Sequence, residues 1–255
     1  MLATRVIPTL LLRDSGLVKG SKFKDHKYVG DPVNAVRIFN TKEVDELVFL
    51  DISATLARRK PNYGLLADIA SQAFMPFGYG GGLACIADIE TLFKIGVEKA
   101  ILNTAAVHNL GFVHDASRVA GAQSIVVSMD VRKSLLGKYH VYTNSGQVNT
   151  KLDPIELAKR MEDAGAGEII LTSIDKEGTG SGYDLELIRK VASAVGVPVV
   201  ASGGAGCLQH LKEAAQSGAS AVAAGNMFTF HGKHKAVLIT YPEYSALESL
   251  FEEGA

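Results

Sequence analysis

Two glycine-rich turns are the segments of this chain whose residue types are best suited to chemistry. The first is Gly80–Gly82 and the second is Ser202–Gly206, with Gly82 and Gly204 lying 122 residues apart. Each turn follows a short apolar run, typical of a strand, and precedes an amphipathic run, typical of a helix. Glycines let backbone N–H groups approach an anion, and a helix start adds partial positive charge. The turns therefore predict two phosphate-binding sites, with glycines that only form tight turns as the alternative.

Small or polar residues end the next apolar run in each half of the chain. Asn103 and Thr104 stand there in the first half, and Gly225 and Asn226 stand there in the second. In (βα)8 barrels, phosphate often binds where two successive strand-to-helix loops meet. Because this pairing occurs twice, it predicts a phosphorylated small molecule with a phosphate at each end.

A repeat with the same offset covers much of the chain. ELVFLDIS at Glu46–Ser53 is echoed by EIILTSID at Glu168–Asp175, and Cys85 corresponds to Cys207. Eight short apolar runs alternate with amphipathic stretches, which predicts βαβ units and a buried parallel sheet. The predicted strands are Arg5–Leu11, Glu46–Ile52, Phe77–Tyr79, Lys99–Leu102, Ser124–Asp130, Glu168–Thr172, Val197–Ala201 and Ala221–Ala224.

This order predicts an α/β fold, a single (βα)8 TIM barrel over residues 1–255 with similar half-barrels at about 1–122 and 123–255. A doubly wound sheet is the alternative, and it explains the constant offset less well. Two insertions, Gly20–Asp31 and Ser134–Gln147, follow strands and should lie at the C-terminal face, where barrels of this kind hold their active sites. The first predicts a lysine-rich lid or an ordinary solvated loop. The second predicts a hairpin turning near Gly137–Lys138.

Composition excludes several classes of function. The chain has 255 residues, 47% hydrophobic and 21% charged, with a net charge of −1. No basic field favours nucleic acid or a membrane surface, and no run is long enough to span a membrane. The two cysteines read as copies of one small packing residue rather than a disulfide, which favours a cytoplasmic location. The seven histidines show no metal-ligand spacing, so we expect neither metal nor cofactor.

The motifs also resemble a known family. RVIP, LVFLDISA, GYGGG, LNTAAV, EIILTSIDKEGTGSGYDLELI and ASGGAG are similar to the cyclase subunit (HisF) of imidazole glycerol phosphate synthase, from about Leu2 to Phe230. The resemblance implies a lyase-type subunit of a glutamine amidotransferase. A HisH-like glutaminase would bind its N-terminal face, and ammonia would cross the barrel to a bis-phosphate substrate at the C-terminal face.

One position departs from the family pattern. The resemblance implies two catalytic aspartates, and Asp130 supplies one of them, but Leu11 stands at the other. A positioned acid or base contributes about 10²–10⁴ in rate, so cyclase activity should be severely reduced. Asp14 could replace it only if the first strand ended early. LLLRDSGLVKGSKFKDHKYVGDP resembles a branch associated with sugar amidation in surface-polysaccharide synthesis, which implies a separate sugar amidotransferase as a further partner.

The remaining candidate site residues are predicted from the two glycine-rich turns and the family resemblance together. Candidate phosphate- and substrate-binding residues are Lys19, Gly81, Gly82, Asn103, Thr104, Thr172, Ser202, Gly203, Gly204, Gly225 and Asn226. Arg5, Glu46, Lys99 and Glu168 each begin a predicted strand. Composition alone favours a salt-bridged plug at the barrel floor, since buried charges must be paired. The resemblance implies that the same four residues form an ammonia gate.

Overall fold

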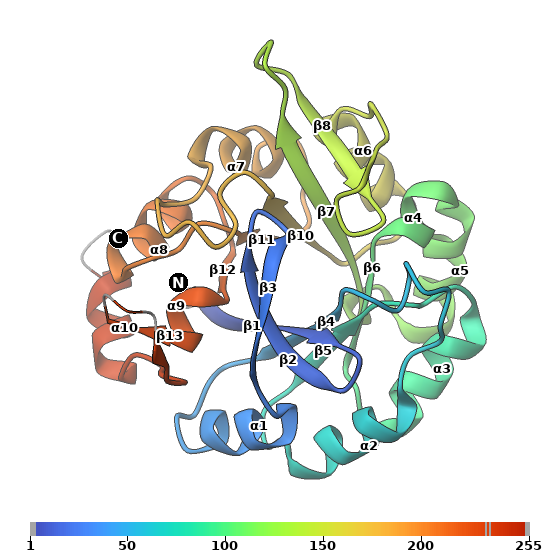
Figure 1. The fold of residues 1–255 in the computed structure, drawn as a ribbon. Coiled ribbons are helices and arrows are strands. Elements are labelled where there is room, and N and C mark those ends of the chain that lie inside the picture. The colour runs from blue at the N-terminus through green and yellow to red at the C-terminus, as the bar shows by residue number, and fades with distance from the viewer. Residues whose placement is uncertain (1–3, 233, 235, 253–255) are drawn as a thin grey trace.

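Eight parallel strands form a closed ring in the computed structural model, which describes residues 4–232, 234 and 236–252 (Figure 1). The ring strands are β1 (Arg5–Arg13), β4 (Leu47–Asp51), β5 (Phe77–Gly80), β6 (Lys99–Leu102), β7 (Ile125–Lys133), β10 (Glu168–Ser173), β11 (Val199–Ser202) and β12 (Ala221–Ala224). Closure occurs where β1 pairs with β12, with Arg5 opposite Ala221 and Pro8 opposite Ala224. The fold is therefore a (βα)8 barrel, and the doubly wound alternative is wrong.

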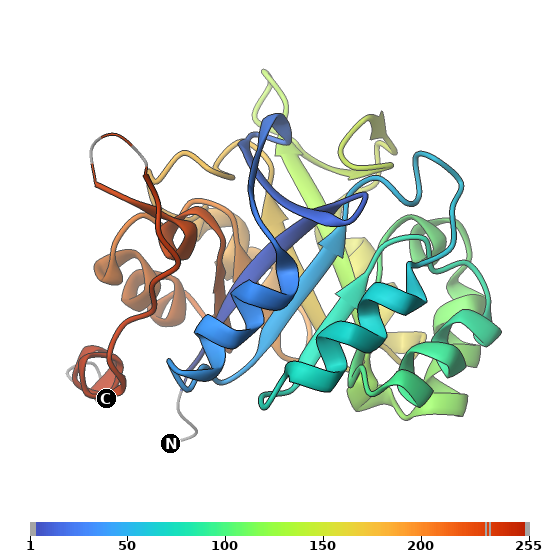
Figure 2. The same ribbon diagram turned by 60° about the horizontal axis from the view of Figure 1, so that its bottom comes forward.

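Helices surround the ring on its outside (Figures 1 and 2). They are α1 (Pro32–Asn40), α2 (Tyr63–Gln72), α3 (Ile86–Ile95), α4 (Thr104–His108), α5 (Leu110–Ala120), the 3₁₀ turn η1 (Ala122–Ser124), α6 (Pro154–Asp163), α7 (Leu185–Ala192), α8 (Leu208–Gln216), α9 (Asn226–Thr229) and α10 (Tyr244–Glu252). Asp31, Asn62, Asp153 and Asp184 cap the starts of four of these helices through side-chain oxygens. None of the described helices is long and apolar enough to cross a membrane.

The sequence repeat appears as a repeat of elements. Phe77 begins β5 and Val199 begins β11, 122 residues later. The starts of α3 and α8 are separated by the same 122 residues. Cys85 and Cys207 occupy the N-cap positions of α3 and α8. Both thiols are free and exposed, so our prediction that they are packing residues is wrong. Cys85 instead lines the cavity at the barrel mouth, and its Sγ donates to the buried carboxylate of Asp88 at 3.2 Å.

Most strand boundaries agree with the sequence prediction, and β6 and β12 agree at both ends. β1 and β7 extend beyond the predicted ends to Arg13 and Lys133, because each continues into an antiparallel partner. Glu46 directly precedes β4 rather than beginning it. The additional strands are β2 (Gly16–Ser21), β3 (Lys24–Gly30), β8 (Tyr139–Thr143), β9 (Val148–Asn149), β13 (Phe230–His231) and β14 (Ala236–Val237).

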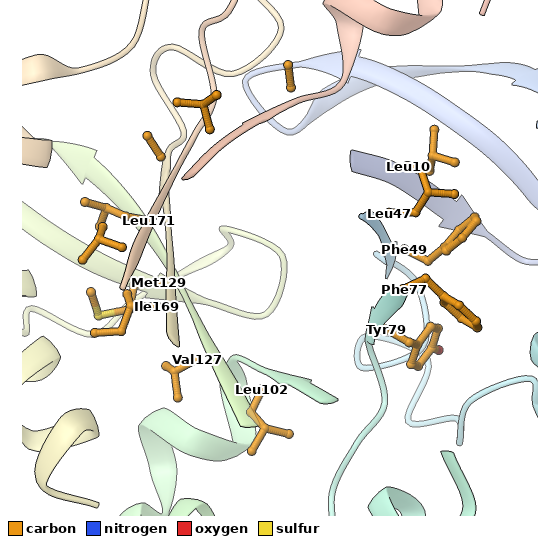
Figure 3. Packing of buried hydrophobic residues seen from close by; sticks show 14 of the residues in the cluster. Leu10, Leu47, Phe49, Phe77, Tyr79, Leu102, Val127, Met129, Ile169 and Leu171 are labelled. Atoms are coloured by element: carbon orange, nitrogen blue, oxygen red, sulfur yellow. The ribbon is translucent and has the colours of Figure 1, made fainter. Parts of the chain in front are cut away.

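The barrel has two layers of apolar packing. The interior is filled by branched and small side chains: Ile7, Val48, Ile101, Val126, Ile170, Val200, Ala221 and Ala223. A larger cluster fills the space between strands and helices, and Figure 3 shows part of it. There Phe49 of β4 meets Phe77 of β5 edge to face, with ring centroids 5.9 Å apart. The alternation of inward and outward side chains along each strand produces both layers.

Removing Phe49 should therefore destabilise the outer layer. Phe49 is 0% exposed, and Phe49→Ala should lower the free energy of unfolding by about 3–5 kcal/mol through lost burial and a cavity. Phe74 is 88% exposed and provides a matched control, since Phe74→Ala should change stability by less than about 0.5 kcal/mol. Urea unfolding of both variants checks the difference, and equal effects would contradict this packing.

Candidate functional site

A cavity of about 640 Å³ opens at the C-terminal ends of the barrel strands. It brings together residues from both halves of the chain. Asp130 and Leu11 line it. So do all the binding residues predicted from the sequence, which are Lys19, Gly81, Gly82, Asn103, Thr104, Thr172, Ser202, Gly203, Gly204, Gly225 and Asn226. Their convergence follows from barrel closure, which gathers the carboxyl ends of all eight strands at one mouth.

The first glycine cradle lies between the loops after β4 and β5. Gly81 has φ +125°, and a Cβ there would lie 2.5 Å from the carbonyl oxygen of Asp51. Only glycine therefore fits at this close approach. The Gly82 N–H donates to Thr55 Oγ1 at 3.3 Å. The Asp51 carboxylate accepts hydrogen bonds from the backbone of Ser53 and Ala54, which fixes the neighbouring loop.

The second cradle has the same form on the other side of the mouth. Gly204 has φ +119°, and any Cβ would collide with the carbonyl oxygen of Gly182. Asn226 Nδ2 donates to the carbonyl oxygens of Gly20 and Gly178, each at 3.2 Å. The cradle is thus tied to the β2–β3 hairpin. Sequence reasoning expected this hairpin to be a lid or a loop.

Lys19 of β2 reaches into the second cradle. Its side chain is 3% exposed, its ammonium donates to the carbonyl oxygen of Thr9, and it lies against Gly225. Burial lowers the pKa of Lys19 to about 8, and the nearby carboxylate of Glu177 opposes that shift. The group is therefore a cation at neutral pH, placed where an anion in the cradle would meet it.

The β2–β3 hairpin crosses the mouth and is fastened on its far side. The Lys22 N–H donates to the carbonyl oxygen of Glu177 at 2.9 Å, and the ring of Phe23 packs against Gly146 in the insertion after β8. The hairpin therefore covers part of the cavity. The sequence pattern of this segment, which is dominated by lysines, did not reveal its strands.

Asp130 lies at the mouth on β7, half-buried. Asn103 Nδ2 donates to its carboxylate at 3.1 Å. Burial raises the pKa of Asp130 to about 7, and the Asn103 hydrogen bond acts in the opposite direction. A carboxyl group that titrates near neutrality can give or take a proton at working pH, which suits general acid–base chemistry.

No acid faces Asp130 from β1. Leu11 lines the cavity from β1, which lies four strands around the ring from β7. β1 continues to Arg13, so the early strand end that Asp14 would need does not occur. Asp14 is instead exposed and paired with Arg59 at 3.1 Å. Of the two opposite strand ends, on β1 and β7, only that of β7 therefore carries a carboxyl group, whereas a symmetric acid–base pair would need one on each.

Three basic residues at the rim of the mouth, Arg58, Arg59 and Lys60, were not predicted from the sequence. Arg13 also lines the cavity, with its guanidinium 3.0 Å from the ring of His26. The run of three basic residues in the loop that follows the predicted strand Glu46–Ile52 was the available signal, and it went unused. Among the described residues, no group of three or more His, Cys, Asp or Glu could hold a metal ion.

Four charges close the opposite end of the barrel in one ring, here called the floor ring: Arg5, Glu46, Lys99 and Glu168. Arg5 pairs with Glu46 at 2.5 Å and with Glu168. Lys99 pairs with both acids, each at 2.8 Å. Both carboxylates are buried. Burial of Arg5 acts to lower its pKa, but Glu168 and Glu46 beside it raise the pKa above its ordinary value. Signs alternate around the ring, so each buried charge has two partners of opposite sign.

These features define the class of protein: a (βα)8 barrel with two glycine-rich turns and an aspartate at its mouth. The model of the family described as "Histidine biosynthesis protein" matches residues 5–235. The chain belongs to this family.

Relatives cover almost the whole chain. A protein of Pseudomonas aeruginosa, "Putative imidazole glycerol phosphate synthase subunit hisF2", is 49% identical over 97% of this chain and 99% of its own length. "Putative imidazole glycerol phosphate synthase subunit HisF" of Leptospira interrogans is 45% identical over 98% of this chain and 100% of its own. "Imidazole glycerol phosphate synthase subunit HisF" of Hydrogenobaculum is 44% identical over 90% and 92%. The chain is therefore a HisF-like subunit.

The pKa of Asp130 predicts a pH-dependent stability. The folded state holds a proton on Asp130 up to about pH 7, whereas an unfolded aspartate releases it near pH 4. The stability contributed by Asp130 therefore falls as pH rises from about 4 to 7. Asp130→Asn cannot ionise and therefore avoids this loss. The free energy of unfolding of Asp130→Asn minus that of wild type should be about 1–3 kcal/mol larger at pH 8 than at pH 4.5. Urea unfolding at both pH values measures this, with exposed Asp14→Asn as control. A difference that does not change with pH would contradict it.

Proposed function

We propose that this chain passes ammonia from a HisH-like glutaminase through its barrel, for amidation of a surface-polysaccharide sugar by a separate sugar amidotransferase. One observation carries the proposal: the floor ring is complete, whereas the mouth has Leu11 where a second acid would stand. The chain keeps what is needed to admit ammonia and lacks half of the groups needed to use it.

The floor ring supports the first step. Two cations and two anions alternate across the barrel axis, and the Lys99 side chain, 19% exposed, is more accessible than those of Glu46 and Glu168, which are 5% and 7% exposed. Bringing Lys99 out of the ring would open the floor without moving the strands. A glutaminase bound at this face would release ammonia next to that lysine.

The barrel interior supports the second step. Above the floor ring the axis is lined by aliphatic side chains such as Ile7, Val48 and Ile170. Neutral ammonia is small and crosses an apolar layer at far lower cost than ammonium does. The layer therefore keeps the molecule unprotonated and nucleophilic until it reaches the mouth.

The mouth supports binding of a phosphorylated small molecule. Two glycine cradles face it, and Lys19 adds a cation at the second. Preorganised N–H groups and a desolvated ammonium both favour a phosphate group. In our proposal this ligand reports that the acceptor pathway is supplied, and it holds the β2–β3 hairpin closed.

A second function is favoured by the residues that remain at the mouth. Asp130, Asn103 and both cradles would suit a cyclase that makes imidazole glycerol phosphate from a bis-phosphate ribotide and ammonia. The names of the relatives carry that activity. Leu11 argues against it, because loss of one acid or base costs about 10²–10⁴ in rate.

Removing the Lys99 side chain should uncouple glutamine hydrolysis from sugar amidation. With the cognate glutaminase and sugar amidotransferase, Lys99→Ala leaves Glu46 and Glu168 with one cation, so the floor no longer opens and closes as one unit. We expect glutamine-dependent amidation to fall roughly tenfold, while glutamine hydrolysis and amidation from ammonium salts continue. Lys94→Ala, an exposed lysine in the last turn of α3, is the control. Unchanged glutamine-dependent amidation in Lys99→Ala would contradict the proposal that ammonia passes through the barrel floor.

A further inference from the structure

The tip of the β7–β8 hairpin exposes two leucines at the mouth end of the barrel. Leu135 and Leu136 stand at the apex of the turn, and both side chains are almost completely exposed. The hairpin projects beyond the ring of helices in Figure 1, and its tip stands above the other loops in Figure 2. Adjacent, fully exposed leucines on a projecting element mark an interaction site more often than scattered ones do.

The turn that carries these leucines is well defined. The Ser134 N–H donates to the carbonyl oxygen of Lys138 at 2.7 Å, and the Gly137 N–H donates to that of Ser134 at 2.9 Å. The Lys138 N–H donates to Ser134 Oγ at 3.1 Å. The leucines therefore occupy fixed positions in a closed turn.

The hairpin is braced just below its turn, against α7 and the loop after β10. Lys133 pairs with Glu186 at 2.9 Å, and Tyr139 donates to Asp184 at 3.0 Å. The Lys133 N–H also donates to Asp175 at 2.9 Å. The contacts hold the tip away from the barrel, so the leucines cannot fold back onto it. A rigid tip loses little entropy when a partner binds it.

The charge at the tip indicates the chemistry of its partner. The segment VRKSLLGKYHV contains Arg132, Lys133 and Lys138 and no acidic residue. Arg132 and Lys133, just below the turn, are paired with Asp175 and Glu186, whereas Lys138 is exposed beside the leucines. A complementary surface has an apolar socket for two leucines and an acidic rim for Lys138.

We infer that this tip is where the ammonia-consuming amidotransferase docks onto the barrel, an inference that rests on the proposed function. Leu135 lies two residues beyond the end of β7 and five beyond Asp130, so it is at most about 17 Å from Asp130 at about 3.3 Å per residue. A protein held by the tip therefore lies beside the mouth, at the end of the barrel where ammonia would leave. The glutaminase would bind at the floor, the opposite end, so both partners fit at once.

A protein partner suits the tip better than a membrane does. Two leucines and one lysine are a small anchor for a bilayer, since stable membrane binding needs more apolar surface or a larger basic patch. In a protein socket the same side chains are fully desolvated and specific. A second copy of this chain is the other protein that could cover the leucines, and crosslinking from the tip distinguishes the two.

The first test places a photo-crosslinking amino acid at Leu136 in the organism's own cells and identifies the products by mass spectrometry. The control carries it at Val119, an exposed position on α5. We expect a crosslink from position 136 to an enzyme that amidates a sugar with ammonium salts. A crosslink only to a second copy of this chain, only to lipid, or to the same proteins as the control overturns the inference.

The second test measures transfer in a reconstituted system of barrel, glutaminase and that amidating enzyme. L135S/L136S should reduce glutamine-dependent amidation and affinity for the amidating enzyme by roughly tenfold or more. Glutamine hydrolysis, ammonium-dependent amidation and the melting temperature should match wild type. If L135S/L136S amidates as wild type does, the docking site is wrong and the proposed function stands. If wild type itself gives no glutamine-dependent amidation, the proposed function fails and the inference fails with it.

Discussion

The hydrogen-bonded ladder between β1 and β12 is the contact on which the rest of the structure depends. It closes the sheet, so the eight strands have no free ring edge and all their carboxyl ends meet at one mouth. Residues as far apart as Gly81 and Gly204 then face one cavity. The same closure brings Arg5, Glu46, Lys99 and Glu168 together at the other end, because strand starts converge as strand ends do.

The two ends of the barrel have different chemistry because they bury charge differently. At the floor each charged group is paired with two of opposite sign, so the ring is stable and closed. At the mouth, buried Lys19 and half-buried Asp130 form no salt bridge with any of the described residues, and burial moves both pKa values toward neutrality. In our proposal the floor controls the passage of ammonia, and the mouth is where protons and anions are handled.

The sequence predicted the barrel, its strands and the residues around its mouth, since strand periodicity and glycine turns are local signals. It did not predict the β2–β3 hairpin, because Lys22, Lys24 and Lys27 hide its alternation and its fastening to Glu177 is a long-range contact. Nor did it indicate that Cys85 and Cys207 are exposed. Where Asp14 points depended on how far β1 extends, which its antiparallel pairing with β2 decides.

We propose that Leu11 deprives the chain of the second acid that cyclisation of a bis-phosphate ribotide needs. The most direct measurement supplies the bis-phosphate ribotide and ammonium salts to wild type and to Leu11→Asp, without glutaminase, and follows imidazole glycerol phosphate. We expect wild type to turn over about 10²–10⁴ times more slowly than Leu11→Asp, whose activity should depend on Asp130. Wild-type turnover equal to that of Leu11→Asp, and abolished by Asp130→Asn, would contradict it.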